Sequence, residues 1–241
     1  LISDIHGCYE EYRKLLDQIR FSDKDRLYIL GDAMDRGPYP IKVIQDIMAR
    51  PNITYIIGNH DYEFFYFAKK LSARSAGKDP MNDMSEEELY ALAGWLQDGG
   101  SITLRQFSEL SVKDGGTILE YLADASAYEV LEEGGKEYIL VHAGIDNFRE
   151  DRELEEYDFL DFISSRPDYT RRYYQREEVF VVTGHTPTPL IREDELPLVY
   201  QKNGHIAIDC GCVFGGRLAA YCIESGKITY VTGENREKTE V

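Results

Sequence analysis

Five short apolar runs in this chain each end in polar residues, and this repeated pattern restricts the fold more than any other feature. Residues 27–30 lead through a glycine to Asp32, and residues 53–57 lead through a glycine to Asn59. Apolar runs of this length are usually buried strands. A buried charge is costly unless it is paired or bound to a metal, so each strand end is a candidate site. The five segments are LISDIHG, LYILGD, TYIIGNHD, YILVHAG and FVVTGHT.

Helical patterns separate the first three apolar runs. Residues 9–19 and residues 41–48 both carry apolar side chains at helical spacing, which gives each segment one face suited to a protein core. The order strand, helix, strand, helix, strand predicts an α/β fold in which helices pack on a parallel sheet.

The rest of the chain divides into segments of different character. Residues 62–130 are polar, acidic and helical in pattern, and we interpret them as a helical insertion or cap. Strand patterns return at residues 138–141 and 179–183, with charged surface segments between them at 146–178. Residues 205–231 alternate short strands with turns, which predicts an antiparallel ending. We expect one domain over residues 1–241, a length that can bury one sizeable core.

Composition excludes some classes of function. The formal net charge is −17, which opposes binding to nucleic acid, and no apolar stretch approaches the ~20 residues of a membrane span. Cys8, Cys210, Cys212 and Cys222 lack the spacing of a disulfide framework or a structural zinc site, so we expect reduced thiols and a cytoplasmic location. Because Leu1 lies within an apolar run, we expect native residues before it.

The residues at the run ends are metal-ligand types. Four of the five histidines lie there, with aspartates and one asparagine: Asp4, His6, Asp32, Asn59, His60, Asp61, His142 and His185. The carboxyl ends of parallel strands line a shared crevice, so these side chains are expected to converge. Oxygen and imidazole ligands suit Mn, Fe or Zn. The number is too high for one ion, and Asp32 is the natural bridge between two. Paired metals are a common device for hydrolysing phosphate esters.

Each motif alone also has an ordinary structural explanation. An Asp-x-His or Gly-Asn-His-Asp sequence is usually a turn, and His142 or His185 alone could be a core or loop histidine. The joint occurrence of such residues at five strand ends favours a dinuclear metal site over these separate explanations.

The ordered motifs resemble a known superfamily. SDIHG, GDAMDRG, GNHD, VHAG and GHTP are similar to the signature blocks of calcineurin-like metallophosphoesterases. The resemblance is greatest to the phosphoprotein phosphatase family in its bacterial and phage branch, and WLQDGGSITLRQF and IDCGCVFGGRL extend it along the chain. It implies an α/β fold built as a β-sandwich of mixed sheets flanked by helices.

The resemblance also implies a set of roles. Asp4 and His6 would bind the first metal, and Asp32 would bridge both metals. Manganese is the ion expected in vitro, with iron or zinc as alternatives. The remaining ligands would hold the second metal: Asn59, His142 and His185.

Four further residues would handle the substrate. His60 would protonate the leaving alkoxide, and Asp35 would orient its imidazole. Arg36 would grip phosphate oxygens, because a planar guanidinium matches their geometry. Arg166 is the expected second phosphate-binding arginine, and its neighbours Arg171 and Arg172 are alternatives.

These roles predict a metal-dependent phosphomonoesterase acting on phosphoserine or phosphothreonine by direct attack of a metal-bound hydroxide. The alternative is a symmetrical dinucleoside polyphosphate hydrolase, a group that often has glutamine in the position of His6. A catalytically inactive scaffold is disfavoured, because all six ligands are present. The substrate, a phosphoprotein or a small phosphoester, and the oligomeric state stay open.

Overall fold

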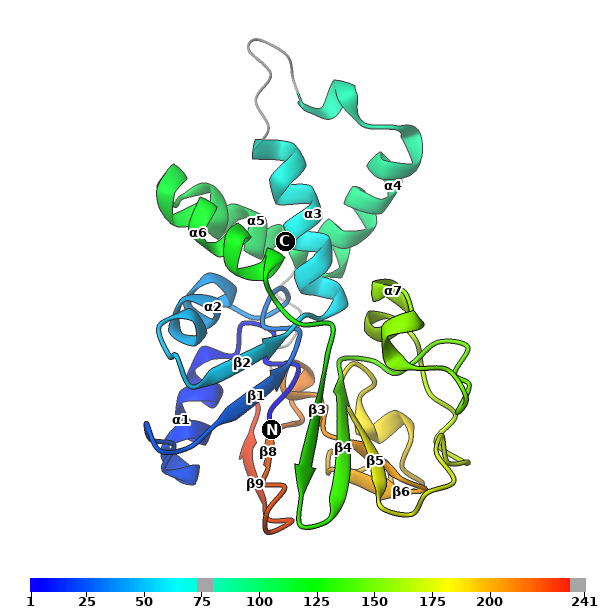
Figure 1. Ribbon diagram of the computed structural model, residues 1–241. Helices are drawn as coiled ribbons and strands as arrows, with labels where there is room; N and C mark the ends of the chain where they lie inside the picture. The colour runs from blue at the N-terminus through cyan, green and yellow to red at the C-terminus, as the bar shows by residue number, and fades with distance from the viewer. Residues whose placement is uncertain (73–79, 235–241) are drawn as a thin grey trace.

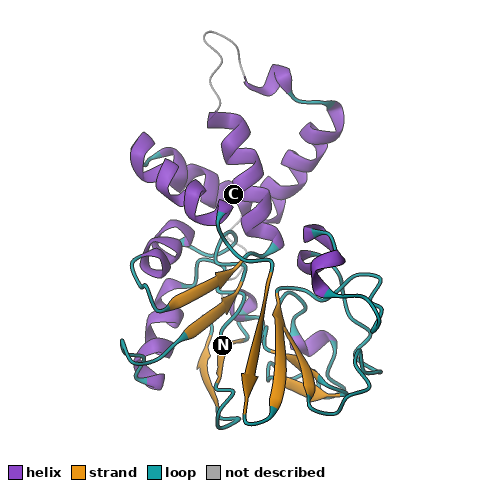
Figure 2. Cartoon of the chain, viewed as in Figure 1, coloured by secondary structure: helices purple, strands orange, loops and turns teal. Residues whose placement is uncertain are grey.

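Two β-sheets packed face to face form the centre of the molecule (Figures 1 and 2). The computed structural model describes residues 1–72 and 80–234. In the first sheet, Ile2 bridges to Ile29 of β1, and the Tyr221 amide of β8 donates to the Leu1 carbonyl, which joins a parallel pair to an antiparallel pair. The parallel pair is β1 (Leu27–Leu30) with β2 (Ile53–Ile56), and the antiparallel pair is β8 (Arg217–Tyr221) with β9 (Ile228–Thr232).

The second sheet is mixed and has the strand order β3-β4-β5-β7-β6. Its three inner strands are parallel, and each edge strand pairs antiparallel with its neighbour. The strands are β3 (Tyr128–Glu133), β4 (Lys136–Val141), β5 (Val179–Thr183), β6 (Tyr200–Lys202) and β7 (His205–Ala207).

Strand alternation builds the sandwich core. Tyr28 and Leu30 of β1 point between the sheets, where they meet Leu140 of β4 and Val182 of β5. The intervening side chains of β1 point to the opposite face, because successive side chains of a strand alternate sides. Each sheet therefore has one face in the shared core and one face covered by other elements. The expected fold, a β-sandwich of mixed sheets flanked by helices, is confirmed.

The two predicted helices cover the outer face of the first sheet. α1 (Tyr9–Ile19) buries Tyr12, Leu15 and Leu16, and α2 (Pro40–Met48) buries its isoleucines in the same cluster. Proline suits the first turn of α2, because that position has no helical acceptor for an amide hydrogen. Both helices, and strands β1 and β2 beside them, lie where the sequence predicts them.

A group of helices stands above the carboxyl ends of β1 and β2 (Figure 1). Its members are α3 (Asn59–Ser72), η1 (Pro80–Asp83), α4 (Glu86–Trp95), η2 (Leu96–Gly100), α5 (Ser101–Ser108) and α6 (Val112–Ala123). The group begins at residue 59 and ends at 123, while residues 128–130 belong to β3. The insertion thus ends before residue 130, because β3 pairs with β4 in a hairpin. Gly134 and Gly135, both with positive φ, close that hairpin. Residues 73–79 of the expected insertion lie outside the described residues.

Residues 146–178 cover the outer face of the second sheet. They contain the short helices η3 (Leu154–Glu156) and α7 (Phe159–Ile163), joined by loops, as their charge predicts. In the described part of the chain, every helix is too short or too polar to cross a bilayer.

Candidate metal centre and phosphate site

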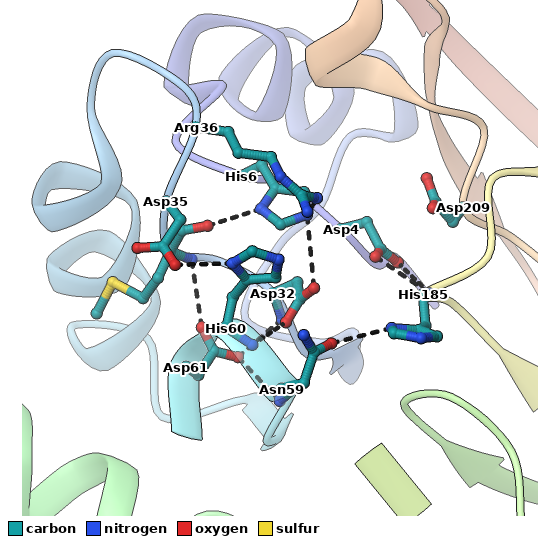
Figure 3. A network of polar contacts seen from close by, with 12 residues as sticks. Asp4, His6, Asp32, Asp35, Arg36, Asn59, His60, Asp61, His185 and Asp209 are labelled. Atoms are coloured by element: carbon teal, nitrogen blue, oxygen red, sulfur yellow. Dashed lines mark hydrogen bonds and ion pairs between the residues drawn. The ribbon is translucent and has the colours of Figure 1, made fainter. Parts of the chain in front are cut away.

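The predicted metal ligands meet at one edge of the sandwich, beside the first turn of α3. Figure 3 shows five of the six, Asp4, His6, Asp32, Asn59 and His185. Asp32 follows β1, Asn59 opens α3 after β2, His142 follows β4 and His185 follows β5. Asp4, His6, Asp32 and His142 are buried, and Asn59 and His185 are half-buried. The fold thus brings together six side chains that are up to 181 positions apart in sequence, as the strand-end argument predicts.

Asp32 lies at the centre of this group. Its Oδ2 atom is 3.5 Å from Nε2 of His6 and 3.5 Å from Nε2 of His142. Its Oδ1 atom accepts a hydrogen bond from the backbone N–H of His60 at 3.1 Å, which fixes the carboxylate plane. One oxygen therefore faces imidazole nitrogens on two sides, the position that a bridging ligand requires.

Backbone carbonyls set the tautomers of two histidines. Nδ1 of His6 donates to the Met34 carbonyl and Nδ1 of His142 donates to the Leu30 carbonyl, each at 2.7 Å. The proton on Nδ1 leaves Nε2 with a free lone pair in the neutral ring, which is how proteins present histidine to a metal. Burial lowers the pKa of His6 well below its ordinary value and keeps the ring in that neutral form.

Asn59 links the second set of ligand atoms. Its Oδ1 atom lies 3.1 Å from Nε2 of His142 and 2.9 Å from Nδ1 of His185. Burial, with the neighbouring His142, lowers the pKa of His185 to about 4, so this ring too is neutral at pH 7. Among the described residues, Asp32 belongs to two groups of possible metal ligands, one with His6 and His60 and the other with His142 and His185. Within each group the donor atoms all lie within 4.8 Å of one another.

Asp4 adds a carboxylate that has no cationic partner among the described residues. Both of its oxygens accept the backbone N–H of His185 at 3.0 Å. Burial, together with repulsion from Asp209 and Asp32, raises the pKa of Asp4 well above its ordinary value. A divalent cation would relieve this repulsion, and the neutral imidazoles and carboxylate oxygens present are its preferred donors. The residues therefore fit divalent metal ions.

Asp209 was not among the predicted site residues. It follows β7, is buried, and accepts the Gly211 N–H at 2.8 Å (Figure 3). Burial raises its pKa to about 6, and the charge of Asp32 adds to the effect. The sequence does contain a signal for Asp209, because residues 206–208 form another apolar run that is followed by an acid.

The backbone around the site is unusual. Asp4, His6, Asp32 and His185 all have positive φ, a region that non-glycine residues seldom occupy and that concentrates at functional sites. Close approach explains one neighbouring glycine, because a Cβ on Gly58 would overlap the Asp32 carboxylate. The turns after the strands thus aim polar side chains inward at a conformational cost.

His60 and Asp35 form the expected pair. Nδ1 of His60 lies 2.7 Å from Oδ2 of Asp35, so Nε2 points toward the cavity. Burial acts to lower the pKa of His60, but the charge of Asp32 and the hydrogen bond to Asp35 outweigh it and raise the value to about 9. Trp95 donates to Oδ2 of Asp35 at 2.7 Å, and Thr103 donates to Oδ1 at 2.6 Å. The insertion therefore positions Asp35.

Arg36 reaches into the same cavity. Its Nη1 donates to Nε2 of His6 at 2.8 Å, and its Nη2 donates to Asp98 at 2.9 Å. The same Asp98 oxygen lies 3.5 Å from Nε2 of His60. The ring of Phe214 lies 5.4 Å from the guanidinium carbon. Arg36 is thus a cation beside the ligand cluster, partly neutralised by a carboxylate from the insertion.

Arg166 also lines this cavity of about 780 Å³, whereas its two neighbours do not. Arg171 is exposed and pairs with Asp168 at 3.4 Å. Arg172 donates to backbone carbonyls of its own loop, including that of Tyr174 at 3.0 Å. Of the three alternatives, Arg166 has the location that a phosphate-binding arginine needs.

Asp61 accepts hydrogen bonds from the turn that carries Asp32. Its carboxylate accepts hydrogen bonds from the amides of Asp32, Met34 and Gly58, at 2.7, 3.2 and 2.9 Å, and from the Tyr55 hydroxyl at 2.8 Å. The bond to Gly58 runs from the third residue of α3 back to the amide that precedes the helix, as the acid of a capping box does. The other three fix the turn that carries Asp32.

A mixed β-sandwich with histidine and carboxylate donors at its strand ends, beside two arginines, defines the class of metallophosphoesterases. Similarity to known proteins agrees with this class. The chain belongs to the calcineurin-like phosphoesterase family, whose model matches residues 1–233.

Named relatives in the same class include two kinds of enzyme. A symmetrical bis(5'-nucleosyl)-tetraphosphatase of Erwinia tasmaniensis is 32% identical over 54% of this chain and 49% of its own length. The asymmetrical bis(5'-nucleosyl)-tetraphosphatase PrpE of Geobacillus thermodenitrificans is 28% identical over 91% of this chain and 88% of its own length. The chain thus spans about half the length of the first relative and most of the second.

Solved structures share the fold. A candidate diadenosine tetraphosphatase superimposes with a TM-score of 0.64 at 21% identity, covering 97% of this chain and 92% of that one. A serine/threonine phosphatase from Saccharomyces cerevisiae gives a TM-score of 0.57 at 13% identity, covering 100% and 80%. At these identities the likeness concerns the fold alone.

Proposed function

We propose that this chain hydrolyses dinucleoside polyphosphates at a site that holds two divalent cations. The observation that carries the proposal is the position of Asp32 Oδ2, 3.5 Å from a ligand nitrogen on each side, in a cavity that also contains Arg36 and Arg166. Both kinds of relative are named bis(5'-nucleosyl)-tetraphosphatases, and one of them matches 91% of this chain.

The site residues would divide the work as follows. The first cation would be held by Asp4, His6 and Asp32, and the second by Asp32 with the remaining ligands, Asn59, His142 and His185. When bound, two such cations supply an activated water and neutralise charge on the phosphoryl group. Manganese is the ion we propose for assays, with iron or zinc as alternatives.

The substrate would be held by cations on both sides of the cavity. The Arg36 guanidinium is suited to grip two phosphate oxygens at once, and Arg166 would bind oxygens farther along the chain of phosphates. A tetraphosphate carries several negative charges, so two arginines beside metal ions match it better than a single clamp would.

His60 would deliver a proton to the departing oxygen. Its Nε2 atom faces the cavity, and Asp35 holds the opposite nitrogen at 2.7 Å. A nucleoside diphosphate is a stable leaving group, whereas a serine alkoxide is not, so protonation matters less for the proposed substrate than for a phosphoprotein.

The phosphoserine or phosphothreonine specificity expected from the sequence has less support than its alternative. The finer resemblance to the phosphoprotein phosphatase family rests on motifs that the nucleotide hydrolases share. The names of these relatives favour the alternative, and cleavage at the symmetrical or at the asymmetrical position is compatible with them, because relatives of both kinds match.

The test is a parallel assay of metal-stripped protein after manganese is restored. Diadenosine tetraphosphate and a phosphothreonine peptide are supplied separately, and products are separated by chromatography. We expect cleavage of the dinucleotide, to ADP alone if the cut is symmetrical and to AMP with ATP if it is not. Phosphate release from the peptide with the dinucleotide intact would overturn the proposal in favour of protein phosphatase activity.

A further inference from the structure

One wall of the metal cavity is apolar, in contrast to the ligands and arginines opposite. The apolar side chains that line it are Pro187, Pro189, Leu190, Pro197 and Phe214. Phe214 keeps 62% of its surface exposed and Leu190 keeps 70%. Single exposed apolar residues are common, but two of them beside three prolines, in the cavity that holds the phosphate clamp, form a surface suited to a ligand.

Phe214 is carried by a short hydrogen-bonded turn. Phe214 ends the short helix η5 (Cys212–Phe214), whose flanking residues Gly211 and Gly215 both have positive φ. Cys212 and Val213 point into the core, which leaves Phe214 as the outward side chain of this turn. The aromatic ring is therefore presented to solvent by a turn in which the Phe214 and Gly216 amides both donate to the Gly211 carbonyl, at 3.0 and 2.9 Å.

Asp209 connects both parts of the wall to the ligand cluster. Its carboxylate accepts the Gly211 amide at 2.8 Å, at the start of the Phe214 turn. Its carbonyl accepts the Thr188 amide at 2.8 Å, in η4 (Thr188–Leu190), which carries Leu190. One buried residue beside the ligand cluster thus accepts hydrogen bonds from the backbone of both parts of the wall.

The phosphate clamp and the aromatic ring are direct neighbours. The Arg36 guanidinium carbon lies 5.4 Å from the centre of the Phe214 ring, within the range of a cation–π contact. A ligand whose phosphates bind Arg36 would therefore bring the group attached to those phosphates over Phe214. A planar aromatic group would gain most from that position.

We propose that this wall is a nucleobase subsite, in which Phe214 stacks on the heterocycle of a nucleotide whose phosphates lie on Arg36. The inference rests on the proposed function and adds the residue that would select nucleotides over phosphopeptides. The five apolar side chains offer no hydrogen-bond donor or acceptor, so the subsite would tolerate different bases, as stacking platforms do.

Direct binding provides the test, because it does not depend on turnover. Two ligands that resist hydrolysis carry the same diphosphonate with and without a nucleoside: α,β-methylene-ADP and methylenediphosphonate. Dissociation constants for both are measured by calorimetry on the manganese-loaded protein. We expect the nucleoside to tighten binding about 5- to 150-fold, the range that one stacked base contributes.

Variants assign the effect to Phe214. Phe214→Ala should bring the ratio of the two dissociation constants close to one, while Phe214→Trp should preserve it. Tyr90 of α4 is an aromatic residue of similar exposure, 72%, outside this cavity, so Tyr90→Ala is the matched control and should keep the wild-type ratio. Circular dichroism verifies that each variant is folded.

The outcomes separate this inference from the proposed function. A wild-type ratio near one, or a ratio that Phe214→Ala leaves unchanged, would overturn the subsite even if diadenosine tetraphosphate is cleaved. A high ratio that depends on Phe214, in a protein that leaves diadenosine tetraphosphate intact, would support the subsite and overturn the proposed substrate.

Discussion

The carboxylate of Asp98 reaches from the helical insertion to the guanidinium of Arg36, with 2.9 Å between Oδ2 and Nη2. The same oxygen lies 3.5 Å from Nε2 of His60, so one carboxylate contacts both the proposed phosphate clamp and the proposed acid. A substrate phosphate would need these same two partners. We therefore infer that Asp98 would compete with a substrate phosphate for these partners.

Asp98→Asn should lower the KM for a phosphoester substrate. Asp98 is exposed whereas Arg36 is half-buried, and a pair with an exposed partner contributes about 0.2–1 kcal/mol, so we expect a decrease of about 1.5- to 5-fold. Steady-state kinetics with saturating manganese measures it. Asp124→Asn, at the exposed end of α6, removes one charge elsewhere in the insertion and controls for net charge. An unchanged or higher KM in Asp98→Asn would show that Asp98 does not compete.

Asp61→Ala should destabilise the protein by about 2–5 kcal/mol, because three buried amides and one hydroxyl lose their acceptor. Asp61→Asn keeps one carbonyl oxygen and should cost less. Urea unfolding of the metal-free proteins measures both changes, and Asp17→Ala on the exposed face of α1 is the control. If Asp61→Ala matched Asp17→Ala in stability, the network around Asp61 would carry no net free energy.

His60→Asn should reduce turnover in proportion to the need of the leaving group for a proton. For an alkyl phosphate we expect a loss of about 10²- to 10⁴-fold, the usual contribution of a general acid. For an aryl phosphate or diadenosine tetraphosphate the loss should be smaller, since those leaving groups are more stable as anions. Bound manganese is measured in parallel. An equal loss on all three substrates would refute the acid role.

The convergence of the candidate ligands could be predicted from sequence because two simple rules reinforce each other. Residues such as Asp32 and His142 stand directly after apolar runs, and the carboxyl ends of parallel strands meet at one edge. No distance information is needed for that argument. The same rule applied to residues 206–208 would have added Asp209 to the site.

The partners supplied by the insertion could not be predicted in this way. Trp95 and Thr103 contact Asp35 across 60 and 68 positions of sequence, and Asp98 contacts Arg36 across 62. These contacts depend on how the insertion helices pack on the turn that carries Asp35 and Arg36. No periodic pattern in the sequence indicates that packing. The edge strand β3 was missed for a different reason, because three of the six residues in its sequence YEVLEE are glutamates and continue the acidic pattern of the insertion.

Asp35→Asn should move the alkaline limb of the pH–rate profile to lower pH. The pKa of His60 is raised to about 9, against the effect of burial, by the charge of Asp32 and by the hydrogen bond to Asp35. An acid must be protonated to act, so turnover of an alkyl phosphate falls as pH rises through that pKa. Removal of the Asp35 charge lowers the pKa, and the fall begins earlier. A limb at the wild-type position would exclude His60 as its origin.

Manganese should raise the thermal midpoint of the wild-type protein and have little effect on Asp32→Asn. A ligand that binds only the folded state at 100 times its dissociation constant adds about 2.7 kcal/mol, which corresponds to about 5–10 °C in a chain of this length. Asp32 belongs to both groups of donor atoms, so its loss should impair both sites, whereas loss of Asn59 should impair only one.

Calorimetric scans with and without a chelator compare Asp32→Asn, Asn59→Ala and the control Asp124→Asn. We expect the manganese-dependent rise to be largest in wild type and in the control, intermediate in Asn59→Ala and smallest in Asp32→Asn. If Asp32→Asn kept more of the rise than Asn59→Ala, Asp32 would not be the shared ligand.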